Sequence, residues 1–305
     1  MRTMQHEARS LIGGLGHLVR GRPDIAVDHA LLAQGMHRPT HEHFEAAKEV
    51  LRYAWSTADY RLTYGGPSCT SLELSSDVEP RRPFDEAIEY GLYGMSDAAH
   101  AVPGTSVANS KSMGGYGIMM GGALIEWRAY RFHTIIPSST HGEMLGASRL
   151  APRLVYHRRI AQFLGIPQDR PTPLFTDNDG VWSLAKDTAP TTSMVYIIRH
   201  VRLLQQMVER GEIAVFQVDG RLNPSDAFTK YLDKISRKMH YLFMMGKHRE
   251  AREFWRSSSH FKNFKPKKIV PVPSPPISLP STVTAALSSR DATASSSSLP
   301  TSSES

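Results

Sequence analysis

The sequence predicts an α/β protein: a mixed five-stranded sheet flanked by helices, with an N-terminal helical segment and a disordered C-terminal tail. Three observations predict this class. Residues 88–136 form strand-like runs rich in β-branched and aromatic residues. Residues 140–235 alternate helical and strand-like stretches, which is typical of a sheet covered by helices. Residues 271–305 are rich in Pro, Ser and Thr and have almost no large apolar side chain, so they cannot build a core.

The composition excludes several classes of protein. The chain has 305 residues, enough for about two domains. It has no apolar run of about 18 residues, so no membrane helix is expected. Its first residues lack the apolar core of a secretory signal. The one cysteine, Cys69, cannot form an internal disulfide and excludes cysteine-based metal sites, which fits a reducing, intracellular compartment.

Residues 1–60 are predicted to be helical. One helix is expected at 22–35, and Thr40 is expected to cap the next. Residues 61–87 contain several Gly and Pro and are interpreted as a linker. The apolar face of the second helix carries, at helical spacing, Phe44, Ala47, Leu51 and Ala54.

The first three strands are predicted at 89–97, 115–122 and 123–136. Gly121 and Gly122 mark a hairpin between the second and third. Strands joined by hairpins pair antiparallel, whereas the later strands alternate with helices, so a mixed sheet is expected.

A long amphipathic helix is predicted to begin near Thr140 and to end at Gly165. After it we expect, in order, a strand at 173–177, helices near 179–187 and 192–210, a strand at 213–218, and a helix from about Ser225.

Positive charge is concentrated after the last predicted strand. The net charge is +7, and residues 233–268 hold eleven Lys and Arg against three acids. A basic segment interleaved with aromatic residues suits a nucleic-acid backbone and its bases, and a solubilising basic tail explains the charge equally well. The aromatic residues are Phe254, Trp255, Phe261 and Phe264.

Four carboxylates lie in four different predicted elements. Asp97 ends the first strand and Glu143 lies in the first turn of the long helix. Asp177 ends a strand at the edge where open α/β sheets place their chemistry, and Asp226 begins a helix. If these acids converge, a divalent cation is needed to neutralise them. Mg²⁺ prefers oxygen ligands, and two such ions serve a phosphodiester hydrolase.

Each acid also has a structural interpretation. An Asp after a strand, such as Asp97, is commonly a turn former. Thr140 and Glu143 match a capping box, with Thr as N-cap and Glu at the third helical position. Asp226 suits a helix start because the helix dipole favours an anion there. These alternatives stay open at the level of single residues.

The acids lie in motifs that resemble those of a known family, the copia-type retrotransposon Pol polyproteins. The similar part is the C-terminal part: the end of the reverse transcriptase followed by the ribonuclease H domain. The resemblance covers roughly residues 7–235. The motifs are Ser96-Asp97-Ala98-Ala99-His100-Ala101, Gly114-Gly115-Tyr116, Glu126-Trp127, Ser138 to Met144, Asp177-Asn178, and Asn223-Pro224-Ser225-Asp226 with Thr229-Lys230.

The resemblance implies a ribonuclease H-like sheet and a division of the chain. Residues 22–25 and 46–53 are similar to the end of the reverse transcriptase. The implied parts are a helical, thumb- or connection-like tail of the reverse transcriptase (1–60), a linker (61–87), a ribonuclease H-like domain (88–235), a basic extension (236–270) and the disordered tail (271–305).

The resemblance also implies a site and partners. It implies that Asp97, Glu143, Asp177 and Asp226 are catalytic and ligate two Mg²⁺ ions, with Mn²⁺ as an alternative. The implied substrate is the RNA strand of an RNA–DNA hybrid. The rest of a Pol polyprotein is an implied partner, no membrane is expected, and the implied location is a cytoplasmic virus-like particle or the nucleus.

The motifs depart from the family at several positions. The family's second Asp and following Trp are Ala99 and His100, and its first Glu in the helix motif is His141. The departures leave two rivals to a nuclease: a catalytically decayed nucleic-acid-binding remnant, or a structural module supporting a polymerase. His100 and His141 could assist proton transfer or be surface histidines. The Asp-Asp pair of a polymerase is absent, so the chain is not expected to synthesise DNA by itself.

Overall fold

The computed structural model describes residues 2–64, 91–99, 112–186 and 195–262. The predicted linker beyond Tyr64, His100 and the predicted tail lie outside the described residues. These described residues belong to one compact unit. Within the described ranges, no helix is both long enough and apolar enough to cross a membrane. The domain boundaries proposed above stay a prediction.

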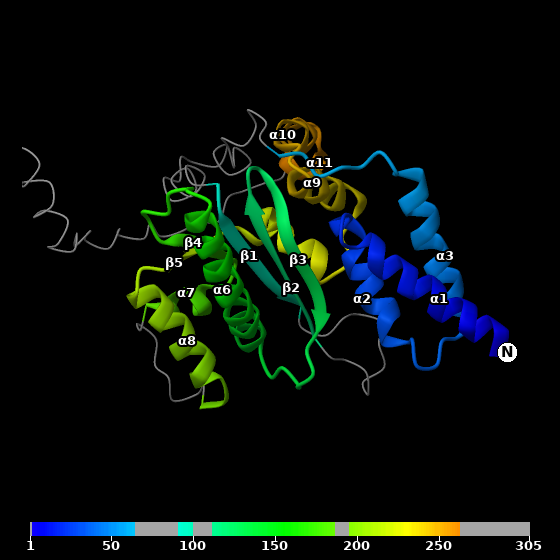
Figure 1. Ribbon diagram of the computed structural model, residues 1–305, viewed down its shortest axis with the longest axis horizontal. Coiled ribbons are helices and arrows are strands. Elements are labelled where there is room, and N and C mark those ends of the chain that lie inside the picture. The colour runs from blue at the N-terminus through cyan, green and yellow to red at the C-terminus, as the bar shows by residue number, and fades with distance from the viewer. Residues whose placement is uncertain (1, 65–90, 100–111, 187–194, 263–305) are drawn as a thin grey trace, which may run out of the picture. The chain divides into compact units, whose positions relative to one another are not determined.

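The predicted mixed sheet is confirmed (Figure 1). The pairs β1–β2 and β2–β3 are antiparallel, whereas β1–β4 and β4–β5 are parallel. The order β3-β2-β1-β4-β5 is that of a ribonuclease H-like sheet. The strands are β1 (Tyr93–Ala99), β2 (Met113–Met120), β3 (Ala123–Arg131), β4 (Thr172–Thr176) and β5 (Ile213–Gln217).

The hairpin between β2 and β3 lies where it was predicted. Gly121 and Gly122 have φ angles of 61° and 89°, the positive values that a two-residue hairpin loop requires. The first strand differs from its predicted bounds, because its pairing with β2 continues as far as Ala99 opposite Met113. Asp97 therefore lies inside β1 and does not end it.

One face of the sheet is covered by α6 (Ser139–Phe163), α7 (Asp179–Ala185) and α8 (Ile198–Glu209), the last preceded by η4 (Val195–Ile197) (Figure 1). Leucines of α6 and α8 pack with Leu174 of β4 in the larger of the two sheet cores. The Ser138 side chain, as N-cap of α6, accepts a hydrogen bond from the backbone N–H of His141 at 3.2 Å. The predicted capping box of Thr140 and Glu143 is therefore wrong.

The opposite face is covered by η6 (Pro224–Phe228), α9 (Lys234–Met244) and α10 (His248–Ser257), which follow the short η5 (Gly220–Leu222). α11 (Ser259–Lys262) follows α10. The predicted helix from Ser225 is thus a short 3₁₀ helix, with Pro224 in its first turn. Trp255 is 2% exposed and packs in this core, so its ring is not available to stack on a base.

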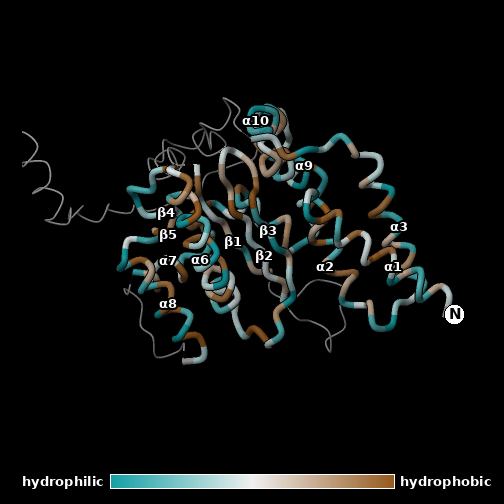
Figure 2. Tube along the Cα trace, in the orientation of Figure 1, coloured by the Kyte–Doolittle hydropathy of each residue, from teal (hydrophilic) through white to brown (hydrophobic). Residues whose placement is uncertain are grey.

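The N-terminal helices are α1 (Arg2–Leu18), η1 (Pro23–Ile25), α2 (Ala26–Gln34) and α3 (His41–Ser56). Figure 2 shows hydrophilic and hydrophobic residues alternating along α1 and α3. The predicted cap is confirmed, because the Thr40 hydroxyl accepts from the backbone N–H of His43. On the predicted apolar face Ala47 and Ala54 are buried, whereas Leu51 is 40% exposed.

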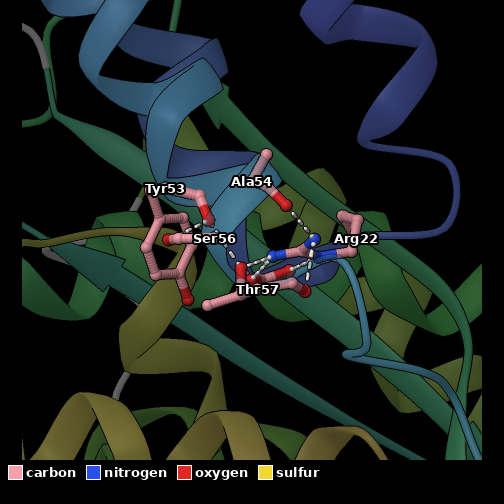
Figure 3. A network of polar contacts seen from close by, with 6 residues as sticks. Arg22, Tyr53, Ala54, Ser56 and Thr57 are labelled. Atoms are coloured by element: carbon pink, nitrogen blue, oxygen red, sulfur yellow. Dashed lines mark hydrogen bonds and ion pairs between the residues drawn. The ribbon is translucent and has the colours of Figure 1, made fainter.

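Arg22 holds the end of α3 against η1 (Figure 3). Its guanidinium forms a two-pronged ion pair with Asp24 at 2.9 and 2.6 Å. It also donates to the backbone carbonyls of Ala54 and Thr57, both at 3.1 Å. A cation at a helix C-terminus satisfies carbonyls that have no partner within the helix. The Arg22 guanidinium therefore fixes the end of α3.

The segment after α3 meets the turn after α9. The Thr63 N–H donates to the Met245 carbonyl at 2.9 Å. The neighbouring Gly246 has a φ of +82°, and a Cβ there would come within 2.1 Å of the Thr63 carbonyl oxygen. This close approach requires glycine.

Gly246→Ala should therefore destabilise the fold strongly. Gly211→Ala is the matched control, because Gly211 also has a positive φ of +65° but has no atom near its would-be Cβ. We expect a loss of about 1 kcal/mol in the control from backbone strain. Gly246→Ala should lose at least about 2 kcal/mol more. Urea denaturation measures both, and equal losses would contradict the steric argument.

Candidate metal centre

Asp97 is fixed by contacts on the face of β1 that η6 covers. It is 2% exposed, and the Thr229 hydroxyl donates a hydrogen bond to Asp97 Oδ2. Its partner in β2 is Gly115, where a Cβ would come within 2.4 Å of Phe228 Cβ. The absence of a side chain at Gly115 lets η6 approach the strand. The turn-forming interpretation of Asp97 is wrong, because the residue lies within a paired strand.

Glu143 reaches across from α6 to the end of β1. Its Oε1 accepts a hydrogen bond from the backbone N–H of Ala98 at 3.0 Å, and its Oε2 is buried with no hydrogen-bond partner. A Cβ on Gly142 would come within 3.2 Å of Ala98 Cβ, so glycine there permits the close packing of α6 on β1. Glu143 thus holds helix and strand together and keeps one oxygen available.

Asp177 was predicted to end the strand and lies one residue beyond it, because β4 ends at Thr176. The next residue, Asn178, caps α7 by accepting from the N–H groups of Gly180 and Val181 at 2.9 and 3.3 Å. A Cβ on Gly220 would come within 2.7 Å of Asp177 Oδ2, so glycine lets the backbone of η5 lie against this carboxylate.

Three of the four predicted acids converge. One carboxylate oxygen from each of Asp97, Glu143 and Asp177 lies within 4.8 Å of the other two. In the part of the chain that the structure describes, this is the group of side chains that could hold a metal ion.

Asp226 adjoins this group without joining it. The segment before η6 is anchored to β1, because Asn223 Nδ2 donates to the Ser96 carbonyl at 2.9 Å and Oδ1 accepts from the Ser225 N–H at 3.1 Å. One oxygen of Asp226 pairs with Lys230 Nζ at 2.9 Å, and the other is buried with no hydrogen-bond partner.

The electrostatics of the site favour a cation. Burial raises the pKa of Glu143 to about 10, and the nearby carboxylates of Asp97 and Asp177 add to the effect. Burial and Asp97 likewise raise the pKa of Asp226 to about 8, although Lys230 opposes the rise. Two buried oxygens without partners and mutual repulsion are what a divalent cation relieves. The residues present therefore fit a metal site.

The sequence motifs contain Asn223, Thr229 and Lys230 but indicate no role for them in positioning these acids. Thr229 and Lys230 lie three and four residues after Asp226, and residues at this spacing lie next to each other in a helical turn. That spacing, together with the capping residue Asn223, was the available signal. His141 is half-buried near the start of α6, and burial lowers its pKa. Its role in proton transfer stays a prediction.

Acids on β1, near the start of α6, after β4 and in η6 are thus arranged around a mixed sheet of the order 3-2-1-4-5. The fold is ribonuclease H-like.

Comparison with known proteins relates the chain to retrotransposon polyproteins. The chain is 25% identical over 230 residues to the Retrovirus-related Pol polyprotein from transposon RE2 of Arabidopsis thaliana, covering 75% of this chain and 14% of that polyprotein. It is 26% identical over 226 residues to the corresponding polyprotein from transposon TNT 1-94 of Nicotiana tabacum, covering 74% of this chain and 15% of the relative. No protein-family model matches the chain.

A shorter relative is covered more fully. The chain is 30% identical over 148 residues to Secreted RxLR effector protein 161 of Plasmopara viticola, which covers 48% of this chain and 88% of that protein. The chain and the Plasmopara protein therefore belong to one family of sequences. Over three quarters of its length, the chain is a distant homologue of copia-type retrotransposon Pol polyproteins.

The raised pKa of Glu143 predicts how stability depends on pH without metal. The folded chain holds the Glu143 proton more tightly than the unfolded chain, whose pKa is near 4.5. This group therefore lowers the free energy of unfolding as pH rises from about 4.5 to about 10. Glu143→Gln should raise the melting temperature of the metal-free protein, and more at about pH 8 than at about pH 6. Mg²⁺ should stabilise the unaltered protein and have little effect on the variant.

Glu126→Gln is the matched control. Burial alone would raise the pKa of Glu126, but hydrogen bonds from His157, Arg153 and Tyr116 outweigh it and lower the pKa. This variant should melt at a lower temperature than the unaltered protein, with the response to Mg²⁺ intact. Differential scanning fluorimetry with and without EDTA measures both, and a Glu143→Gln variant that melts lower at every pH would refute the argument.

Asn223→Ala tests the anchor of η6. The variant removes two buried hydrogen bonds and leaves the Ser96 carbonyl without its donor. We expect a loss of roughly 2 kcal/mol in the free energy of unfolding, together with weaker Mg²⁺ stabilisation because Asp226 is displaced. Asn178→Ala, which removes the half-buried cap of α7, should cost about 1 kcal/mol and is the comparison.

Proposed function

We propose that the chain hydrolyses the RNA strand of RNA–DNA hybrids, as the ribonuclease H part of a retrotransposon reverse transcriptase. The observation that carries the proposal is the convergence of Asp97, Glu143 and Asp177 within 4.8 Å on a ribonuclease H-like sheet. Homology to Pol polyproteins supports a nucleic-acid substrate.

Asp97, Glu143 and Asp177 would hold the cations, with Asp226 completing the set. The chemistry that two Mg²⁺ or Mn²⁺ ions supply at such a site is activation of a water and stabilisation of the leaving 3′-oxygen. Glu143 and Asp226 each present a buried oxygen that lacks a hydrogen-bond partner. Thr229 orients Asp97 through its hydroxyl, and Lys230 neutralises part of the negative charge beside Asp226.

The substrate must be recognised as RNA paired with DNA. The 2′-hydroxyl group is the feature by which such a site tells RNA from DNA. The basic helices α9 and α10 offer charges for the phosphate backbone. The helices α1 to α3 are proposed to be the end of the reverse transcriptase, and the rest of a Pol polyprotein is the proposed partner. The chain spans only 14% of the RE2 polyprotein, so polymerase activity is not proposed for it.

Asp177→Asn tests the proposal. It keeps the shape of the side chain and removes the charge, so hybrid cleavage should fall at least roughly a hundredfold while binding in EDTA is retained. Asp179→Asn is the matched control two residues away, because Asp179 is exposed in the first turn of α7. Cleavage of a hybrid labelled on either strand, with Mg²⁺ or EDTA, is the assay.

The result decides between the nuclease and its rivals. Magnesium-dependent cutting of the RNA strand alone, lost in Asp177→Asn and kept in Asp179→Asn, would support the nuclease. Unchanged cutting by Asp177→Asn would refute the site. A folded protein that binds the hybrid and never cuts it would instead favour the decayed nucleic-acid-binding remnant.

A further inference from the structure

A pocket away from the metal centre lies between the end of α3 and α9. Its volume is about 150 Å³. Four of its lining residues are cationic and none is acidic. The cations are Lys234, Arg237, Lys238 and Lys247.

The charges of this pocket are open to solvent. Lys234, Arg237 and Lys238 are exposed on α9. Lys238 Nζ lies 4.6 Å from the centre of the Phe254 ring, a contact that leaves its charge unneutralised. Lys247 lies 3.7 Å from Glu250, and ion pairs between exposed groups at such a distance contribute little. The pocket therefore presents a net positive rim.

The floor of the pocket is apolar and aromatic. It is formed by Tyr53, Tyr60, Tyr241, Leu242 and Met245. Rings beside exposed cations are typical of sites that hold a single nucleic-acid strand, where bases stack and phosphates pair. The volume lies below the roughly 300 Å³ at which pockets for whole small molecules begin. A pocket of this size holds part of a nucleotide, such as its base, while the rest of the strand lies outside it.

The walls of the pocket are held in place before any ligand binds. Arg22 fixes the end of α3, and its guanidinium lies 5.8 Å from the ring centre of Tyr53 and 5.6 Å from that of Tyr60. Figure 3 shows Arg22 reaching Ala54 and Thr57 beside Tyr53. The hydrogen bond from Thr63 to Met245 joins the two walls. A preformed pocket loses little conformational entropy on binding.

Neighbouring residues lead from the pocket towards Asp226. A smaller pocket next to it shares Arg237 and Tyr241 and extends to Lys230 and Tyr231. Lys230 in turn pairs with Asp226. Lys230 and Arg237 thus lie between the acidic site and the tyrosines of α3, and Asp28 is the one acid among the lining residues of the smaller pocket.

We propose that this pocket binds an unpaired nucleotide of the strand held at the metal centre, with its phosphate on Lys234 and Lys238 and its base against Tyr60. The proposal rests on the proposed function, because it takes the substrate to be a nucleic acid. RNA and DNA share the phosphate and the base, so either strand of a hybrid could supply the nucleotide.

Binding in EDTA tests the proposal without cleavage. The probes are fluorescein-labelled RNA–DNA hybrids with a single-stranded extension on the RNA strand, on the DNA strand, or on neither. Lys234→Gln combined with Lys238→Gln should weaken binding of the extended hybrids roughly tenfold and reduce the salt slope by about 2. The matched control combines Arg199→Gln and Arg202→Gln, exposed cations of α8 on the other face of the sheet (Figure 1).

A second pair of variants tests the stacking. Tyr60→Ala should abolish the preference for an extended over a blunt hybrid, whereas Tyr60→Phe, which keeps the ring, should retain it. The strand whose extension gives the preference identifies the source of the nucleotide. Melting curves of all variants establish that the fold is intact.

Each outcome decides one proposal separately. If the double lysine variant binds the extended hybrids with the affinity and salt slope of the wild type, the pocket proposal is overturned, whatever the cleavage assay shows. Displacement of the hybrid by a polyglutamate peptide, with no preference for an extension, would assign the pocket to an acidic protein and overturn it as well. Pocket-dependent binding without magnesium-dependent cutting would support the pocket and refute the nuclease.

Discussion

Three consecutive residues of β1 hold three separate parts of the chain together. The Ser96 carbonyl accepts from the Asn223 side chain, the Asp97 carboxylate accepts from Thr229, and the Ala98 N–H donates to Glu143. The C-terminal end of β1 therefore fixes both α6 and the segment that carries Asp226. The acidic site exists because these bonds, formed by main chain and side chain alike, converge on a single strand.

Gathering buried carboxylates opposes folding, and the rest of the structure offsets that cost. Hydrophobic cores on the two faces of the sheet, around Leu150 on one and Phe228 on the other, enclose the strands that carry the acids. Apolar burial contributes roughly 25 cal/mol per Å², which makes such cores the main stabilising term. The buried carboxylates therefore destabilise the fold only at the acidic site, where a bound ligand can relieve their repulsion. Such a local loss of stability is common at functional sites.

The sequence alone predicted the strands and the glycine hairpin, because each leaves a local pattern. It predicted that four acids converge, and the structure brings three of them together. It did not predict the cap of α6 correctly, since Ser138 and Thr140 are both good caps. Nor did it predict that Trp255 is buried. The sequence of α10, which carries Trp255, is basic and amphipathic. Its apolar side packs on the face of the sheet opposite α6, and the sequence alone does not show this contact.

The covering of that second face has a consequence for the order of folding during synthesis. β1 to β3 are complete once Arg131 has been made, yet the residues that bury their outer face include Phe243 and Trp255, more than a hundred positions later. A chain emerging from the ribosome must carry an uncovered apolar sheet face until α10 is released. Such exposed faces promote aggregation of incomplete chains. Binding by a chaperone during translation would protect this surface, and the sheet would reach its final packing only near the end of synthesis.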